Sequence, residues 1–89
     1  MRYAAKIDDN QTEIVKALRK LGCSVVLLHR AGKGIPDLLV GFRGRTILME
    51  VKTKNGKLNH KQQNFRDEWR GDPVHVVRSP GEAIKAVVC

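Results

Sequence analysis

The chain has 89 residues, of which 17 are Lys or Arg and 9 are Asp or Glu, so that its formal net charge is +8. A chain this short holds one compact core, which excludes a multidomain enzyme and predicts a single domain over residues 1–89. The positive charge is spread along the whole chain, which indicates a basic surface, not a tail, and favours a polyanionic partner such as nucleic acid.

The first ten residues, MRYAAKIDDN, contain no apolar run of the length that a signal peptide needs, and no later segment is long and apolar enough to cross a membrane. Cys23 and Cys89 are too few for a disulfide framework and show no metal-ligand spacing. We therefore expect a soluble protein without a zinc site in a reducing, intracellular compartment, such as the cytoplasm of a bacterial or phage-infected cell.

The first two elements are expected to be a helix and a strand. Apolar residues recur at helical spacing between Asp9 and Leu21, and Gly22 follows where a helix commonly ends, so we predict an amphipathic helix there. Ser24–His29 is a short run rich in Val and Leu, bounded by polar and glycine residues, which is typical of a buried strand. A loop is expected to follow it.

A β-hairpin is expected next. The segments Asp37–Phe42 and Thr46–Val51 are both apolar, and only Arg43, Gly44 and Arg45 lie between them. Two apolar runs joined by a short connection that contains Gly predict two antiparallel strands.

The C-terminal half predicts a helix, a strand and a final helix. Asn59 stands three residues before Gln62, which resembles a capping box and predicts a helix from about His60 to Trp69. Val74–Val77 reads as a strand, and the sequence Ser-Pro-Gly-Glu after Arg78 predicts the start of a helix that ends near Val88. The order helix, three strands, helix, strand, helix indicates the α/β class.

Two acidic residues are expected to meet at one end of the hairpin. Asp37 opens its first strand and Glu50 lies near the close of its second, and antiparallel pairing brings these two ends together. Carboxylate oxygens are the ligands that Mg²⁺ and Mn²⁺ prefer. Taken singly, Asp37 is better explained as the cap of a turn, and Glu50 and Lys52 as an exposed strand edge; together they predict a shared metal site.

Lys52 is expected to point into the same site. Residues two apart in a strand project from the same face, so Lys52 lies on the face of Glu50 while Val51 points away. A lysine side chain there can help to orient or deprotonate an attacking water, and in its ammonium form it can offset negative charge on a phosphorane. Pro36 restricts the backbone that leads into Asp37, which favours a preorganised site.

The pattern Gly34-Ile35-Pro36-Asp37, then Glu50-Val51-Lys52, then Gln62 on a helix resembles the VRR-NUC family of the PD-(D/E)XK nuclease superfamily, over nearly the whole chain. The resemblance implies a restriction-endonuclease-like core with a mixed central sheet flanked by helices. It also implies that Glu13 on the first helix belongs to the site and that the backbone carbonyl of Val51 contributes to the metal. Arg78 would be the first Arg of the VRR motif that gives the family its name, and Ser79 stands where that motif has its second Arg.

The resemblance further implies a function. Stand-alone members of the family look like minimal, Mg²⁺- or Mn²⁺-dependent endonucleases that form homodimers and cut branched DNA such as Holliday junctions. The expected catalytic residues are Asp37, Glu50, Lys52, Gln62 and Glu13, with metal held by Asp37, Glu50, Val51 and Glu13. The alternative is a non-catalytic nucleic-acid-binding module that keeps the fold and its basic face.

Basic residues around the proposed site are expected to contact DNA phosphates. They lie in loops or at the edges of elements on either side of the acids, and are Arg30, Lys33, Lys54, Lys57, Lys61 and Arg78.

Several of these residues also have simpler explanations. Glu13 is favoured in the first turns of a helix by the macrodipole alone, and Gln62 is explained equally by its capping role. Phe65 and Trp69, four residues apart, most simply form the core-facing stripe of their helix, although Trp69 would also suit an interface between subunits. The three histidines, His29, His60 and His75, lie in different elements and show no metal-ligand pairing.

Overall fold

The computed structural model describes residues 9–28 and 30–89. The element order is α1 (Asp9–Leu21), β1 (Ser24–Leu27), β2 (Leu38–Phe42), β3 (Arg45–Val51), α2 (His60–Glu68), β4 (His75–Val77) and α3 (Pro80–Val88). Every predicted element is present, and the predicted boundaries differ from the observed ones by two residues at most; His29, the predicted end of the first strand, lies outside the described residues. Among the described residues, no helix is long and apolar enough to cross a membrane.

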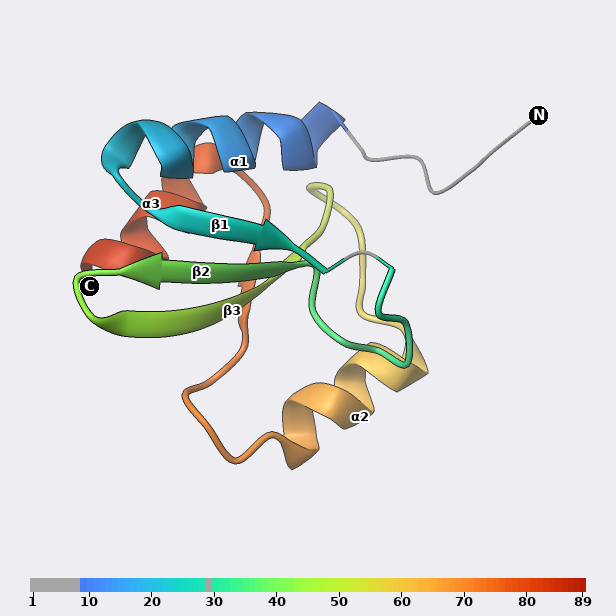
Figure 1. The fold of residues 1–89 in the computed structure, drawn as a ribbon. Coiled ribbons are helices and arrows are strands. Elements are labelled where there is room, and N and C mark those ends of the chain that lie inside the picture. The colour runs from blue at the N-terminus through green and yellow to red at the C-terminus, as the bar shows by residue number, and fades with distance from the viewer. Residues whose placement is uncertain (1–8, 29) are drawn as a thin grey trace.

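The four strands form one mixed sheet in the order β1-β2-β3-β4. β1, β2 and β3 pair antiparallel, whereas β4 pairs parallel with β3. Parallel neighbours need a crossover connection, and α2 lies within it. α1 and α3 lie together on one side of the sheet and α2 lies on the other (Figure 1). The α/β class and the mixed sheet flanked by helices are therefore confirmed.

The tight turn of the β2–β3 hairpin fixes its register. Phe42 pairs with Arg45, which leaves Arg43 and Gly44 as a two-residue turn with φ angles of +49° and +80°. Positive φ at both central residues is the requirement of a type I′ turn, whose twist matches that of the flanking strands. The register that follows pairs Leu38 with Met49.

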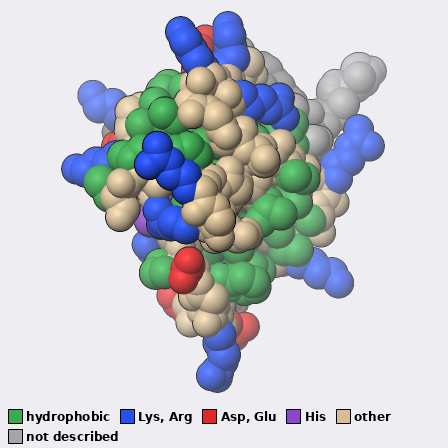
Figure 2. All heavy atoms as spheres, turned by 60° about the vertical axis from the view of Figure 1, so that its left-hand side comes forward, with side chains coloured by type: hydrophobic (Ala, Val, Ile, Leu, Met, Phe, Trp, Pro, Cys, Tyr) green, Lys and Arg blue, Asp and Glu red, His purple; other side chains and the backbone are tan. Residues whose placement is uncertain are grey.

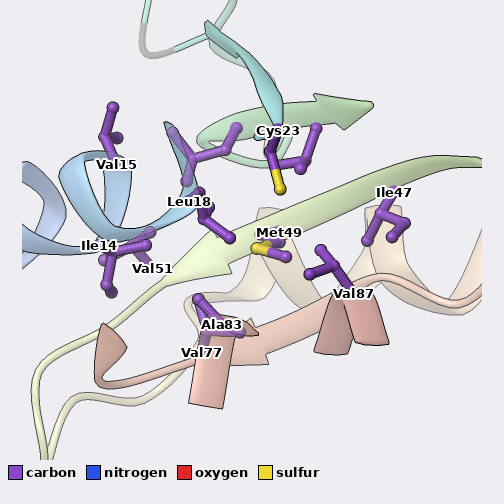
Figure 3. Close-up of a cluster of buried hydrophobic side chains, with 12 residues drawn as sticks. Ile14, Val15, Leu18, Cys23, Ile47, Met49, Val51, Val77, Ala83 and Val87 are labelled. Atoms are coloured by element: carbon purple, nitrogen blue, oxygen red, sulfur yellow. The ribbon is translucent and has the colours of Figure 1, made fainter. Parts of the chain in front are cut away.

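The core lies between one face of the sheet and the two helices α1 and α3. Alternate residues of β2 and β3, including Leu38, Val40 and Met49, are fully buried on this face. The apolar stripe of α1 and the inner face of α3 pack against them (Figure 3), and the free thiol of Cys23 lies in the same cluster. The remaining side chains of each strand project from the opposite face of the sheet.

α2 is attached differently from the other two helices. It buries none of its side chains. Phe65 is half-buried and stacks on Trp69 at a ring-centroid distance of 5.3 Å, and Trp69 remains 44% exposed. The prediction of a core-facing Phe65–Trp69 stripe was therefore wrong, because the core is completed by α1 and α3 on the other face of the sheet.

Replacing Leu38 by Ala is expected to lower the free energy of unfolding by about 2–5 kcal/mol, because a fully buried side chain on a central strand leaves a cavity behind. Val88, 57% exposed at the end of α3, is the control, and Val88→Ala should change stability by no more than about 0.5 kcal/mol. Urea unfolding followed by circular dichroism measures both; equal effects would contradict the assignment of the core.

Candidate active site

The register of the hairpin places the two predicted acids opposite each other. The pair beyond Leu38 and Met49 in the same register is Asp37 and Glu50, so their side chains project from the same face of the sheet. One carboxylate oxygen of Asp37 accepts a hydrogen bond of 2.8 Å from the backbone N–H of Val51. This bond ties the start of β2 to the end of β3 at the level of the site, and the predicted meeting of the two carboxyl groups is observed.

Glu50 is a buried acid, with 3% of its surface exposed. Burial, and then the hydrogen-bonded and like-charged carboxyl group of Asp37, raise the pKa of Glu50 to about 9, while Lys52 acts in the opposite direction. A carboxyl pair of this kind is stabilised either by a shared proton or by a cation between the two groups. The site is therefore built to hold positive charge.

Gln62 has two roles at once. Its Oε1 accepts a hydrogen bond of 2.9 Å from the backbone N–H of Asn59, and its backbone N–H donates to the Asn59 side chain, which completes the predicted capping box. Its Nε2 donates to Oε2 of Glu50 at 3.0 Å. The capping role and the site role, which the sequence left as alternatives, are thus combined in one side chain, because the cap leaves the amide nitrogen free to reach β3.

The backbone on either side of Lys52 is anchored by groups that the sequence did not single out. The side-chain amide of Asn10 on α1 donates to the carbonyl oxygen of Lys52 at 2.7 Å, and the N–H of Lys52 donates to the carbonyl oxygen of Val77 at 3.0 Å. The half-buried side chain of Lys52 is thereby carried by a backbone held from α1 and from β4.

Arg78 anchors the loop that follows Lys52. Its Nη1 donates to the carbonyl oxygens of Thr53 at 2.7 Å and Gly56 at 2.6 Å, and lies 3.4 Å from that of Lys54. This structural role was not expected, because the sequence placed Arg78 among the phosphate contacts. No short-range pattern reveals it, since Arg78 and Thr53 are 25 residues apart.

Glu13 is not brought to the two carboxyl groups. It is exposed on α1 and lines a surface hollow together with Lys16, Lys20 and Pro80, at the start of α3. Among the described residues, no three His, Cys, Asp or Glu side chains form a group that could hold a metal ion. The buried polar residue at this end of α1 is Gln11. It lies on the same stripe of the helix as Ile14 and Val15, so its burial could have been predicted from the sequence spacing.

The donor set that remains fits a small, hard divalent cation. It consists of two carboxylates at the ends of paired strands, with the backbone of Val51 beside them. Mg²⁺ is commonly held in proteins by only one or two carboxylates, and takes its other ligands from water and substrate phosphates. Two carboxylates are therefore sufficient for such an ion.

The remaining basic candidates surround this site. Arg30 and Lys33 lie in the loop before Asp37, and Lys54, Lys57 and Lys61 lie in the loop after Lys52 and at the start of α2. All five are exposed. Their side chains are available to a polyanion that approaches the carboxyl pair from outside.

Two comparisons with known proteins identify the same family. The model of the VRR-NUC domain family matches residues 3–81 of the chain. A solved structure described as a VRR_NUC domain is similar to it at a TM-score of 0.72 and 32% sequence identity, with 88% of this chain and 89% of that chain covered. No curated protein matches the chain.

The raised pKa of Glu50 makes stability depend on pH. An acid whose pKa is higher in the folded than in the unfolded chain stabilises the fold at low pH, and this contribution is lost as the pH rises towards the folded-state value. Without divalent metal, the free energy of unfolding should therefore fall between about pH 4.5 and pH 9. Glu50→Gln, which cannot ionise, should remove most of this slope and raise stability at pH 8 by on the order of 1–3 kcal/mol.

Urea unfolding in EDTA over this pH range tests the expectation. The matched control is Glu68→Gln, at an exposed acid on α2, which should leave the slope as in the wild type. A wild-type slope that survives in Glu50→Gln would show that another group is responsible.

Proposed function

Because the chain belongs to the VRR-NUC family, we propose that it is a Mg²⁺- or Mn²⁺-dependent endonuclease that hydrolyses phosphodiester bonds of branched DNA, such as Holliday junctions. The single observation that carries the catalytic part is the pairing of Asp37 with the buried Glu50 in register at the end of the hairpin, with Lys52 on the same face. A module that only binds nucleic acid gains nothing from acids placed where phosphates approach.

Each residue of the site has its own role in the proposed reaction. Asp37, Glu50 and the carbonyl group of Val51 would hold the metal, which when bound lowers the pKa of a water and offsets charge on the phosphate. Lys52 orients the attacking water and, as an ammonium group, stabilises the negative charge that develops on the phosphorane. Gln62 fixes the rotamer of Glu50 through its 3.0 Å hydrogen bond. Glu13 has no part in this scheme, because it lies outside the site.

DNA is expected to approach over the loops on both sides of the carboxyl pair. The exposed residues Arg30, Lys33, Lys54, Lys57 and Lys61 neutralise phosphates next to the scissile one. Arg78 contributes mainly by holding the loop that carries Lys54 in place. Such contacts to the backbone give affinity without base sequence, which suits an enzyme that selects DNA by its shape.

We further propose that the enzyme is a homodimer that uses the sheet face opposite the core. Val26, Leu39 and Leu48 are paired across three strands in one row on this face, and Val26 is 51% exposed. Trp69 and Asp72 line a hollow of about 320 Å³ beside Leu39 and Leu48.

A second copy of the chain suits this face better than DNA does. Its hollow is lined by Leu39, Thr46, Leu48, Trp69, Gly71 and Asp72, so that the one charge among these lining residues is negative. A two-fold contact would bury the row of Val26, Leu39 and Leu48 against the same row of a second copy and remove apolar surface from water, whereas DNA phosphates would meet no positive charge in this hollow. On the side of the molecule drawn in Figure 2, hydrophobic side chains (green) lie among many Lys and Arg side chains (blue) and few acids (red).

Cleavage of labelled four-way junction, flap and linear duplex DNA tests the catalytic proposal. Wild type should cut the junction with Mg²⁺ or Mn²⁺ and not with EDTA, and both Asp37→Ala and Lys52→Ala should slow cutting by roughly 10²–10⁴-fold. Lys16→Ala, on the outer face of α1, is the control and should cut normally. Salt-sensitive binding without cleavage under any metal would instead support the binding module.

Sedimentation analysis tests the dimer. Val26→Lys places a charge in the middle of the proposed interface and should shift the protein to monomers, while Val88→Lys, at an equally exposed valine on α3, should not. A wild-type protein that sediments as a monomer, or two variants that behave alike, would contradict the proposed interface.

A further inference from the structure

The loop before Asp37 touches the backbone at the start of α2. Gly34 has a φ of +77°, and a Cβ atom at this position would overlap the carbonyl oxygen of Lys61 and lie 2.5 Å from its carbonyl carbon and 3.0 Å from the nitrogen of Gln62. Because the obstacle is backbone, no side-chain rotation would relieve it. Only glycine permits this approach of the two segments.

Apart from its own capping box, the start of α2 has few described contacts that fix it relative to the sheet. The helix buries no side chain, and its described links to the sheet side of the molecule are the bond from Gln62 to Glu50 and one from Nε of Arg66 to the carbonyl oxygen of Val74 at 3.2 Å. The Arg66 bond lies one turn further along the helix. The direction of the first turn, and with it the reach of Gln62, therefore depends on what the turn rests against.

We propose that Gly34 is a positioning residue of the active site. By letting the loop rest on the Lys61–Gln62 backbone, it holds the side chain of Gln62 against Glu50 and so couples the segment that leads into Asp37 to the orientation of the second carboxyl group. The positioning itself is independent of the reaction; its effect on DNA cleavage rests on the proposed nuclease function.

The same loop offers a matched control. Gly32 also has a positive φ, +69°, but a Cβ atom there would meet nothing within 4 Å. Gly32→Ala and Gly34→Ala therefore carry similar backbone strain in the same loop, and only Gly34→Ala forces α2 away.

The direct readout is the side-chain amide resonance of Gln62 in the metal-free protein, assigned by its loss in Gln62→Ala. In Gly34→Ala it should move to the position of a solvent-exposed amide, whereas in Gly32→Ala it should stay as in the wild type. An unchanged resonance in Gly34→Ala, or equal changes in both variants, would overturn the proposal. Should Gly34→Ala be unfolded, the comparison is repeated in trimethylamine N-oxide, an osmolyte that favours folded states.

Cleavage rates give the second readout. At saturating DNA, Gly34→Ala should cut about 10²-fold more slowly than Gly32→Ala, because a small displacement of a positioned group has effects of this size. In a Gln62→Ala background, Gly34→Ala should slow cutting by less than about 2-fold further, since the two changes remove the same link. Additive losses would show that Gly34 does not act through Gln62.

The two readouts separate the two proposals. If the wild type cuts no DNA but the Gln62 resonance responds as described, the nuclease proposal fails and the positioning role stands. If the wild type cuts DNA but the Gln62 resonance does not change in Gly34→Ala, the positioning role fails and the nuclease proposal stands.

Discussion

The pairing of β2 with β3 is the constraint on which the site depends. A shift of one residue in this pairing would move each side chain of one strand to the other face of the sheet. It would bury Asp37 or Glu50 in the apolar core and turn core residues such as Leu38 outward. The two-residue turn at Arg43-Gly44 fixes the register from one end, and the bond from the N–H of Val51 to Asp37 fixes it at the other. The same pairing thus determines the core and the carboxyl pair.

The carboxyl pair, of which Glu50 is buried, also explains why so much of the surrounding structure is polar. Glu50 is nearly inaccessible and lies against another acid, which is costly unless hydrogen bonds and a positive charge are supplied. Gln62 supplies a hydrogen bond, Lys52 supplies a positive charge that acts on Glu50, and Asn10 holds the backbone from which Lys52 projects. The carboxyl pair is therefore electrostatically costly for a small protein, and a bound cation would lower that cost.

The sequence predicted those features that depend on neighbours along the chain. The helix of Asp9–Leu21, the hairpin and the capping box at Asn59 follow from periodicity, turn residues and local spacing, and the meeting of Asp37 with Glu50 follows from the hairpin. Contacts between distant segments could not be predicted this way. The approach of Gly34 to Lys61 and the bonds of Arg78 to the loop at Thr53 depend on how the elements pack, and Glu13 was placed in the site by family resemblance alone.

Titration of Mn²⁺ into the DNA-free protein, followed by calorimetry in two buffers with different heats of ionisation, tests the account most directly. Since burial raises the pKa of Glu50 to about 9, the wild type at pH 7.5 should bind the ion and release a proton to the buffer. Asp37→Ala should bind far more weakly, and Glu50→Gln should release no proton. Tight binding that is indifferent to both substitutions, or no binding by the wild type, would contradict the assignment of the carboxyl pair as the metal site.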